Sequence, residues 1–262
     1  MMIPPQGGER TAYARDLVAG TRHLLLDWFA AGLEVQAKQD RTPVTEADVA
    51  MERHIRDALL ARFPGDGFFG EETGEAAGGD WLWLLDPIDG TRSFTRGYGF
   101  FSTQLAAMQA DQLVLGVSQA PVADELIWAE SGAGAWMGAQ RLQVSDTTSL
   151  ECAHLSIGNV SSLAADAPAW SRLAALIGQC ERHRGYGDYL HYHMLARGQI
   201  DLLLESDVSI LDIAALTVIV REAGGVITDL SGAPIDRHST SVIAANPVLH
   251  RQALSLMQPE AA

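Results

Sequence analysis

Two carboxylates in the segment 81–94 could bind a metal ion beside a phosphate group. The segment reads WLWLLDPIDGTRSF, so five apolar residues lead directly to Asp86, and Asp89 follows shortly after. The apolar run is typical of a buried strand. Because Pro87 has no N–H group and fixes its own φ angle, we expect strand pairing to stop there. A helix that begins after Gly90 would direct free N–H groups at the two acids, and this combination suits a cation together with an anion.

Two more acids are candidates for the same site. Glu71 follows the short run 68–70, and a strand–loop–strand arrangement across the glycine-rich connection after it would bring it beside Asp86. Asp212 lies at the start of a predicted helix. Considered alone, each of these acids could have a role other than metal binding. Acids in exposed loops are usually only solvated, and an aspartate at a helix start is most often an N-cap.

The first half of the chain must position most of these acids with a mixture of helices and strands. Helical spacing of apolar residues predicts one amphipathic helix over 10–31 and another over 51–63. Thr45 and Asp48 precede the second helix and are typical of a capping box. Antiparallel strands are predicted at 102–108, 113–120, 125–129 and 135–137. We therefore expect an N-terminal α+β subdomain, residues 1–146, that contains the metal site.

In the second half of the chain the predicted strands and helices alternate. Strands are predicted at 154–157, 181–184, 200–205, 226–229 and 242–245, and helices at 169–180, 189–196, 212–222 and 248–257. Such alternation is typical of a layered α/β unit. We therefore expect a C-terminal α/β subdomain, residues 147–262, that completes the site.

Composition excludes several classes of partner. The 262 residues carry a formal net charge of −15, which would repel nucleic-acid backbones and anionic membranes. No apolar window is long enough to span a bilayer, and the first ten residues lack the apolar core of a signal peptide. The two cysteines do not make a disulfide framework in a chain of this length. The sequence therefore predicts a cytoplasmic protein that binds neither nucleic acid nor membrane.

Three motifs carry a resemblance to a known family. They are Gly70-Glu71-Glu72, the hexapeptide DPIDGT at 86–91, and Asp212-Ile213-Ala214-Ala215 with Glu222-Ala223-Gly224-Gly225. In this order and spacing they resemble the inositol monophosphatase superfamily over nearly the whole chain. The resemblance implies an α+β / α/β fold with αβαβα layers and two packed subdomains. It also implies a homodimeric, Mg²⁺-dependent phosphomonoesterase that Li⁺ inhibits.

The resemblance assigns the acids to two Mg²⁺ ions. It implies that Glu71, Asp86 and the carbonyl of Ile88 bind one ion, and that Asp86, Asp89 and Asp212 bind the other. Hard oxygen ligands of this kind are those that Mg²⁺ prefers. In a two-metal site one ion activates the attacking water and the other stabilises the leaving oxygen.

Further roles follow from the same resemblance. Glu71 and Thr91 would orient and deprotonate the water, with Asp89 as the third catalytic residue, and the N–H groups of Gly90 and Thr91 would bind the phosphate. The residues implied to support the metal site from behind, where a weaker third Mg²⁺ could bind, are Lys38, Asp40, Thr45, Asp48 and Glu72.

The residue after DPIDGT indicates the branch of the superfamily. Arg92 at this position makes DPIDGTRSF similar to the histidinol-phosphate phosphatases, and the segment 184–201 resembles a second motif of that branch. Asp188 within this segment would pair with a cationic group, and histidinol phosphate carries an ammonium and an imidazole. Glu205 matches a family position that contacts the body of the substrate. The resemblance therefore implies hydrolysis of histidinol phosphate.

Some residues depart from the pattern of that branch. Tyr186, Leu190 and Leu211 replace a glycine, a tyrosine and an aromatic residue, which predicts a reshaped substrate pocket. His191 and His193 could face the pocket, but a single histidine on a helix is more often structural or exposed. Inositol 1-phosphate, another sugar or polyol phosphate, or a nucleotide 3′-phosphate is the alternative substrate. A non-catalytic metal- and phosphate-binding regulator is the alternative from a different class.

Overall fold

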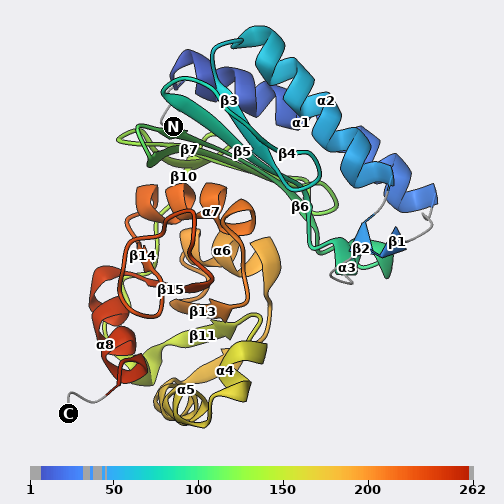
Figure 1. Ribbon diagram of the computed structural model, residues 1–262. Coiled ribbons are helices and arrows are strands. Elements are labelled where there is room, and N and C mark those ends of the chain that lie inside the picture. Colours follow the sequence, from blue (N-terminus) through green and yellow to red (C-terminus); the bar gives the residue numbers. More distant parts are fainter. Residues whose placement is uncertain (1–6, 32–35, 38–42, 45, 260–262) are drawn as a thin grey trace. The chain divides into compact units, whose positions relative to one another are not determined.

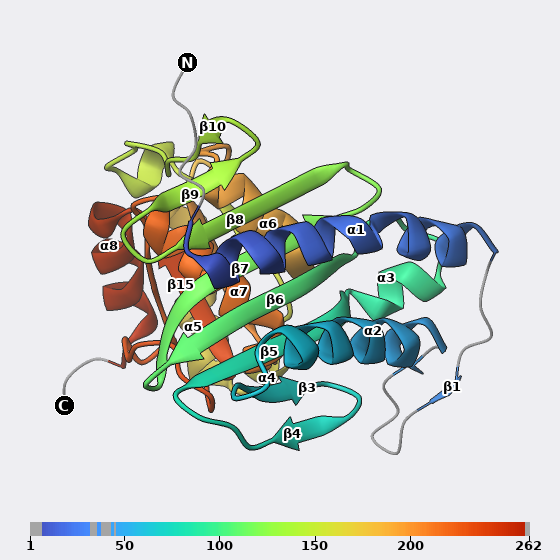
Figure 2. The ribbon, with the colours of Figure 1, turned by 90° about the horizontal axis from the view of Figure 1, so that it is seen from above.

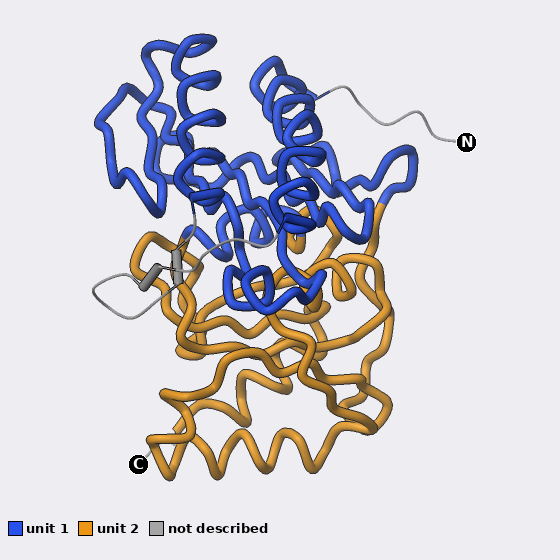
Figure 3. Tube along the Cα trace, turned by 90° about the vertical axis from the view of Figure 1, so that its right-hand side faces the viewer, with its two compact units in different colours: residues 1–141, 211–219 blue, residues 142–210, 220–262 orange. Residues whose placement is uncertain are grey.

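The computed structural model describes residues 7–31, 36–37, 43–44 and 46–259. The chain forms two compact units, shown in Figure 3 and along the chain in Figure 1. Unit 1 comprises residues 1–141 and 211–219, and unit 2 comprises residues 142–210 and 220–262. This division differs from the predicted one at residues 142–146, which belong to unit 2, and at residues 211–219, which follow the expected boundary in the sequence but pack within unit 1. The reason is a contact between the helix that contains them and the sheet of unit 1, described below.

Unit 1 is built on an eight-stranded sheet with the order β10-β9-β8-β7-β6-β5-β3-β4. Neighbouring strands are antiparallel, except that β3 and β5 are parallel. The strands are β3 (Gly67–Gly70), β4 (Gly74–Ala76), β5 (Trp81–Asp89), β6 (Ser102–Gln109), β7 (Gln112–Ala120), β8 (Glu125–Glu130), β9 (Gly134–Met137) and β10 (Gln140–Arg141). A separate pair is formed by β1 (Gln36–Ala37) and β2 (Pro43–Val44).

Two long helices cover one face of this sheet. Figure 2 shows α1 (Glu9–Ala31) and α2 (Glu46–Arg62) lying across the strands. Alternate strand residues such as Trp83 and Leu85 point toward these helices and join Val18 and Met51 in one buried apolar core. The helices over 10–31 and 51–63 and the antiparallel strands predicted from apolar spacing are thereby confirmed.

The middle of α7 (Ile210–Glu222) packs on the other face of the sheet of unit 1. Gly116 of β7 lies against the backbone of Ala215, so closely that a Cβ atom at residue 116 would overlap it. Only glycine permits this close approach between β7 and α7.

Unit 2 contains a five-stranded mixed sheet with the order β12-β11-β13-β15-β14. The strands are β11 (His154–Ile157), β12 (Arg182–Arg184), β13 (Leu202–Ser206), β14 (Val226–Thr228) and β15 (Ser241–Ala245). The other elements are η1 (Leu150–Cys152), α4 (Ser161–Ala165), α5 (Ala167–Gln179), α6 (Asp188–Ala196) and α8 (Pro247–Met257). The predicted alternation of strands and helices is confirmed, although α4 was not predicted. Both cysteines, which the structure describes, are free thiols.

Two packing layers stabilise unit 2. Leu173 of α5 and Leu249 of α8 pack with Leu202 and Leu204 of β13 in one apolar cluster, while α6 lies on the opposite side of β13 (Figure 1). No helix in the described part of the chain is both long and apolar enough to cross a bilayer.

Candidate active site

A bulge in β5 puts two predicted metal ligands on the same face of the sheet. Asp86 pairs with Gln104 of β6, whereas Asp89 pairs with Ser102, so β5 has one more residue than β6 between the two pairs. Without the extra residue, acids three positions apart would point to opposite faces. The expectation that Pro87 ends strand pairing is therefore wrong in part. The strand resumes and extends to Asp89, because a bulge accommodates a residue that cannot donate to the ladder.

Glu71 lies beside Asp86 because β3 and β5 are parallel. Gly70, the last residue of β3, pairs with Leu85, and the residue that follows each of them in the sequence is an acid. The predicted arrangement is confirmed, and the short strand β4 lies within the glycine-rich connection. Glu71 itself is exposed, whereas Asp86 is only 3% exposed and Asp89 7%.

Asp212 joins these acids through α7. The register places Gly116 in the same cross-strand row as Leu84, two residues before Asp86 and hence on the same face of the sheet. The contact between Gly116 and Ala215 fixes α7 over this row, and Asp212 is one helical turn before Ala215. The sheet face that bears Asp86 is thus the face on which α7 lies.

The electrostatics of Asp86 show that the acids form one cluster. Burial raises the pKa of Asp86 well above its usual value, and the negative charges of Glu71, Asp89, Asp212 and Asp48 raise it further. A buried carboxylate among like charges stays ionised only if a cation neutralises it. The cluster therefore has the charge and the oxygen donors that a hard cation such as Mg²⁺ requires.

The carboxylate oxygen atoms of the cluster do not converge on one position where a metal ion could bind. Among the described residues, no three His, Cys, Asp or Glu side chains are arranged to hold one metal ion. This finding is compatible with the raised pKa of Asp86, because the two depend on different distances. Mg²⁺ ligation requires oxygen atoms about 2.1 Å from the ion, whereas charges interact over several ångströms. Mutual repulsion of like charges favours this open arrangement.

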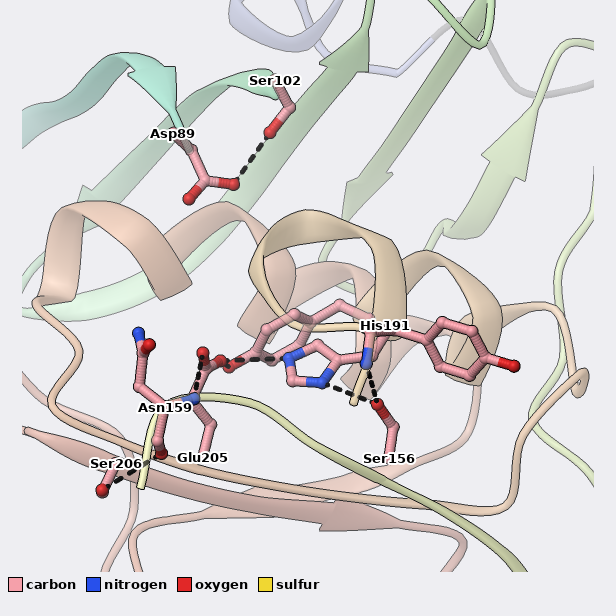
Figure 4. Close-up of polar contacts among 9 residues, drawn as sticks. Asp89, Ser102, Ser156, Asn159, His191, Glu205 and Ser206 are labelled. Atoms are coloured by element: carbon pink, nitrogen blue, oxygen red, sulfur yellow. Dashed lines mark hydrogen bonds and ion pairs between the residues drawn. The ribbon is translucent and has the colours of Figure 1, made fainter. Parts of the chain in front are cut away.

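Hydrogen bonds orient Asp89 and Asp86. The hydroxyl of Ser102 donates to Oδ2 of Asp89 at 2.9 Å (Figure 4), and Nε2 of Gln104 donates to Ser102 Oγ at 2.7 Å. Oε1 of Gln104 is buried and has no hydrogen-bond partner within the described residues. The N–H group of Ile88 donates to Oδ1 of Asp86 at 3.0 Å. Ser102 and Gln104 were not among the residues predicted for the site, and only their alternation along a strand beside DPIDGT could have indicated them.

The DPIDGT segment continues into a short helix, as predicted. Gly90 adopts a left-handed conformation, with φ of 83°, just before α3 (Thr91–Thr95). The hydroxyl of Thr91 donates to the carbonyl oxygen of Ile88 at 2.9 Å. That carbonyl keeps a second lone pair for another partner. Arg92 is exposed on α3.

Part of the predicted supporting set can be located. Asp48 is 1% exposed in α2 and acts on Asp86 through its charge. Glu72 lies in the turn that follows β3. Lys38, Asp40 and Thr45 lie outside the described residues.

Both residues predicted to contact the substrate body lie in unit 2. Asp188 begins α6 with φ of 44°, a left-handed conformation that aspartate tolerates better than most residues. Glu205 of β13 is 3% exposed, and its Oε2 atom lies 3.0 Å from Nε2 of His191 and 3.2 Å from the hydroxyl of Tyr192. His191 is fully buried, and its Nδ1 atom lies 3.2 Å from Ser156 Oγ (Figure 4). The interpretation of His191 as structural is thereby supported.

Comparisons with known proteins match nearly the whole chain. The inositol monophosphatase family matches residues 8–261. A histidinol-phosphatase of Mycobacterium tuberculosis is 38% identical over 86% of this chain and 88% of that protein. A fructose-1,6-bisphosphatase/inositol-1-monophosphatase of Thermotoga maritima is 30% identical over 95% of this chain and 96% of that protein.

Solved structures agree with this relationship. The extragenic suppressor protein suhB of Bartonella henselae superposes with a TM-score of 0.88 at 27% identity, covering 97% of this chain and 100% of that chain. An inositol monophosphatase of Thermotoga maritima gives a TM-score of 0.86 at 31% identity, covering 95% and 97%. The fold class predicted from the sequence is confirmed. With the acids of DPIDGT, Glu71 and Asp212 gathered around one buried carboxylate, the chain is a phosphatase that belongs to the inositol monophosphatase family.

Proposed function

We propose that the protein is a Mg²⁺-dependent phosphomonoesterase whose substrate is histidinol phosphate. The observation that carries the metal-dependent part is Asp86, a buried carboxylate whose pKa is raised by burial and by four neighbouring acids. An enzyme gains nothing from such a costly arrangement unless a cation compensates it. The donor set is made of oxygen atoms alone, as Mg²⁺ prefers.

The metal ligands are proposed to be the residues expected from the sequence. They are Glu71, Asp86, Asp89, Asp212 and the carbonyl oxygen of Ile88, for two ions, and a third ion is proposed near Asp48. When bound, Mg²⁺ would supply the positive charge that lowers the pKa of water and stabilises a leaving oxygen. The hydrogen bonds from Ser102 to Asp89 and from the Ile88 N–H to Asp86 orient these two carboxylates within the cluster.

Thr91 and Glu71 are proposed to control the attacking water. The hydroxyl hydrogen of Thr91 is committed to the carbonyl of Ile88. Its oxygen atom can therefore only accept a hydrogen bond, which would orient a water molecule whose second proton is directed elsewhere. Glu71 is exposed and adjacent to Asp86 in register, so it is suited to accept that proton.

The residues proposed to contact the phosphate and the rest of the substrate are those that the family resemblance implies. The left-handed conformation of Gly90 turns the backbone at the start of α3, and the N–H groups of Gly90 and Thr91 are proposed to bind phosphate oxygens. Arg92, Asp188 and Glu205 are proposed to recognise the rest of the substrate. The names of the histidinol-phosphatases of Mycobacterium tuberculosis, at 38% identity, and Streptomyces coelicolor, at 37%, support histidinol phosphate.

Phosphate release from a substrate panel tests this proposal. We expect kcat/KM to be highest for histidinol phosphate among histidinol phosphate, inositol 1-phosphate and adenosine 3′,5′-bisphosphate. Asp188→Asn should lower kcat/KM for histidinol phosphate by about tenfold or more, the value of one charge-assisted hydrogen bond, and leave inositol 1-phosphate little changed. Asparagine also tolerates the left-handed conformation of residue 188.

The control for Asp188→Asn is Glu151→Gln, which removes an exposed carboxylate from the same unit. This variant should retain the wild-type substrate order. Equal rates on all three substrates would refute a histidinol-phosphate pocket, and equal losses on every substrate in Asp188→Asn would show that Asp188 has no role in specificity.

Inositol 1-phosphate is the second candidate substrate. It is favoured by the Thermotoga maritima relative and by an inositol-1-monophosphatase of Mesorhizobium japonicum, which is 32% identical over 86% of this chain. The same panel decides between the two substrates. A homodimer, a cytoplasmic location and inhibition by Li⁺ are further proposals that the family resemblance supports.

A further inference from the structure

A buried carboxylate on α2 is bonded to the turn that carries Glu71. Glu52 is fully buried, yet no basic side chain pairs with it in the described part of the chain. Instead, its Oε2 atom accepts the backbone N–H of Glu72 at 2.7 Å, and its Oε1 atom accepts the N–H of Thr73 at 2.6 Å. Both distances are typical of charge-assisted hydrogen bonds. The carboxylate is thus satisfied by the backbone of one turn.

The end of β3 is shaped to admit this carboxylate. A Cβ atom at Gly70 would lie 2.5 Å from the carboxyl carbon of Glu52, which is closer than real Cβ atoms approach. Gly70 does not have a positive φ angle, so glycine is needed here for space and not for backbone conformation. The space at Gly70 and the two backbone N–H groups together accommodate the Glu52 carboxylate.

Glu52 differs from the neighbouring acid on the same helix. Asp48 lies one helical turn before Glu52, and its charge raises the pKa of Asp86. The two oxygen atoms of Glu52 instead accept backbone N–H groups of the turn that follows β3. The contact that distinguishes Glu52 is therefore made with the backbone of this turn.

The bonded N–H groups bear directly on the orientation of Glu71. The N–H of Glu72 belongs to the planar peptide group that follows the Cα atom of Glu71. Holding this peptide plane and the next one fixes the backbone on the carboxyl side of Glu71, and with it the direction of the Cα–Cβ bond. Without the Glu52 carboxylate, these two N–H groups would lose their partners and the turn would gain conformational freedom.

We infer that Glu52 is a positioning residue that fixes the turn 71–73 and so holds Glu71 toward Asp86. The inference rests on the proposed function, in which Glu71 is a metal ligand and the acceptor of a water proton. Glu52 touches neither substrate nor metal in this account. It acts only through the backbone of the turn.

Glu52→Gln is the first test, because glutamine keeps the size but offers one acceptor oxygen in place of two. Hydrogen exchange of the Glu72 and Thr73 amides, measured without metal, should quicken by about tenfold or more, while amides within α2 and β5 keep their rates. Calorimetric titration with Mg²⁺ alone should show affinity about 10- to 100-fold weaker than wild type. The control Glu46→Gln removes an exposed carboxylate from the same helix and should match wild type in both measurements.

Gly70→Ala perturbs the same contact from the other side and does not depend on the folding of Glu52→Gln. The added methyl group should displace the carboxylate and produce the same quickened exchange and weakened Mg²⁺ binding. Unchanged exchange at both amides in these variants would overturn the inference, as would quickened exchange with wild-type Mg²⁺ affinity. Failure of the proposed function is distinguishable, because the wild-type protein itself would then release no phosphate with Mg²⁺.

Discussion

Asp89→Asn is expected to lower kcat for phosphate release by about 10³-fold or more, which corresponds to about 4 kcal/mol of transition-state stabilisation. The substitution preserves size and can preserve the hydrogen bond from Ser102, but it removes one negative charge from the acids around Asp86. Cation binding depends on that charge. The measurement is the initial rate of phosphate release at saturating substrate over a range of Mg²⁺ concentrations.

A matched control separates loss of charge at the site from loss of charge in general. Asp111→Asn makes the same change at an exposed turn between β6 and β7, where φ of 60° suits asparagine as well as aspartate. It should keep wild-type activity. If Asp89→Asn retained more than about a tenth of the wild-type kcat, Asp89 could not be an essential metal ligand.

Gly116→Ala is expected to damage both stability and activity. The new methyl group would overlap the backbone of Ala215 and push α7 away from the sheet. Overpacking of this kind costs about 1–3 kcal/mol in the free energy of unfolding. Because Asp212 is one turn away on α7, a displacement of about 1 Å should also lower kcat about 100-fold. Denaturant unfolding and phosphate release together check the prediction.

The same substitution at another glycine should have the opposite sign. Gly20 is exposed within α1, does not have a positive φ angle, and has no atom near the position of an added Cβ. Gly20→Ala should therefore stabilise the protein by up to about 1 kcal/mol, since alanine favours the helix, and leave kcat unchanged. Wild-type stability and activity in Gly116→Ala would show that α7 does not depend on the close approach.

The sequence predicted the elements well where apolar spacing is regular. The helix α1 and the strand β11 were expected within one residue of their observed bounds, and α2 was expected but begins at Glu46, before the predicted range 51–63. Local capping also defines the start of α8, where the Asn246 side chain accepts the N–H groups of Val248 and Leu249. These features depend on local periodicity and capping, which one sequence displays.

The sequence predicted which residues could form the site but not how the fold brings them together. DPIDGT indicated two acids, but acids three positions apart share a sheet face only through the bulge at Pro87 and Ile88, which strand periodicity cannot indicate. Glu52 and Ser102 escaped notice because each acts through a contact with a residue far away in the sequence. Similarly, nothing local marks Gly116 as the place where α7 approaches the sheet.

The most direct test of the central claim is the metal dependence of phosphate release. The protein is stripped with EDTA, dialysed, and assayed with the best substrate of the panel while Mg²⁺ is titrated back. The account predicts no release above background without Mg²⁺ and a saturable return of activity in the wild-type protein, with no such return in Asp89→Asn. Full activity in the presence of EDTA would contradict it.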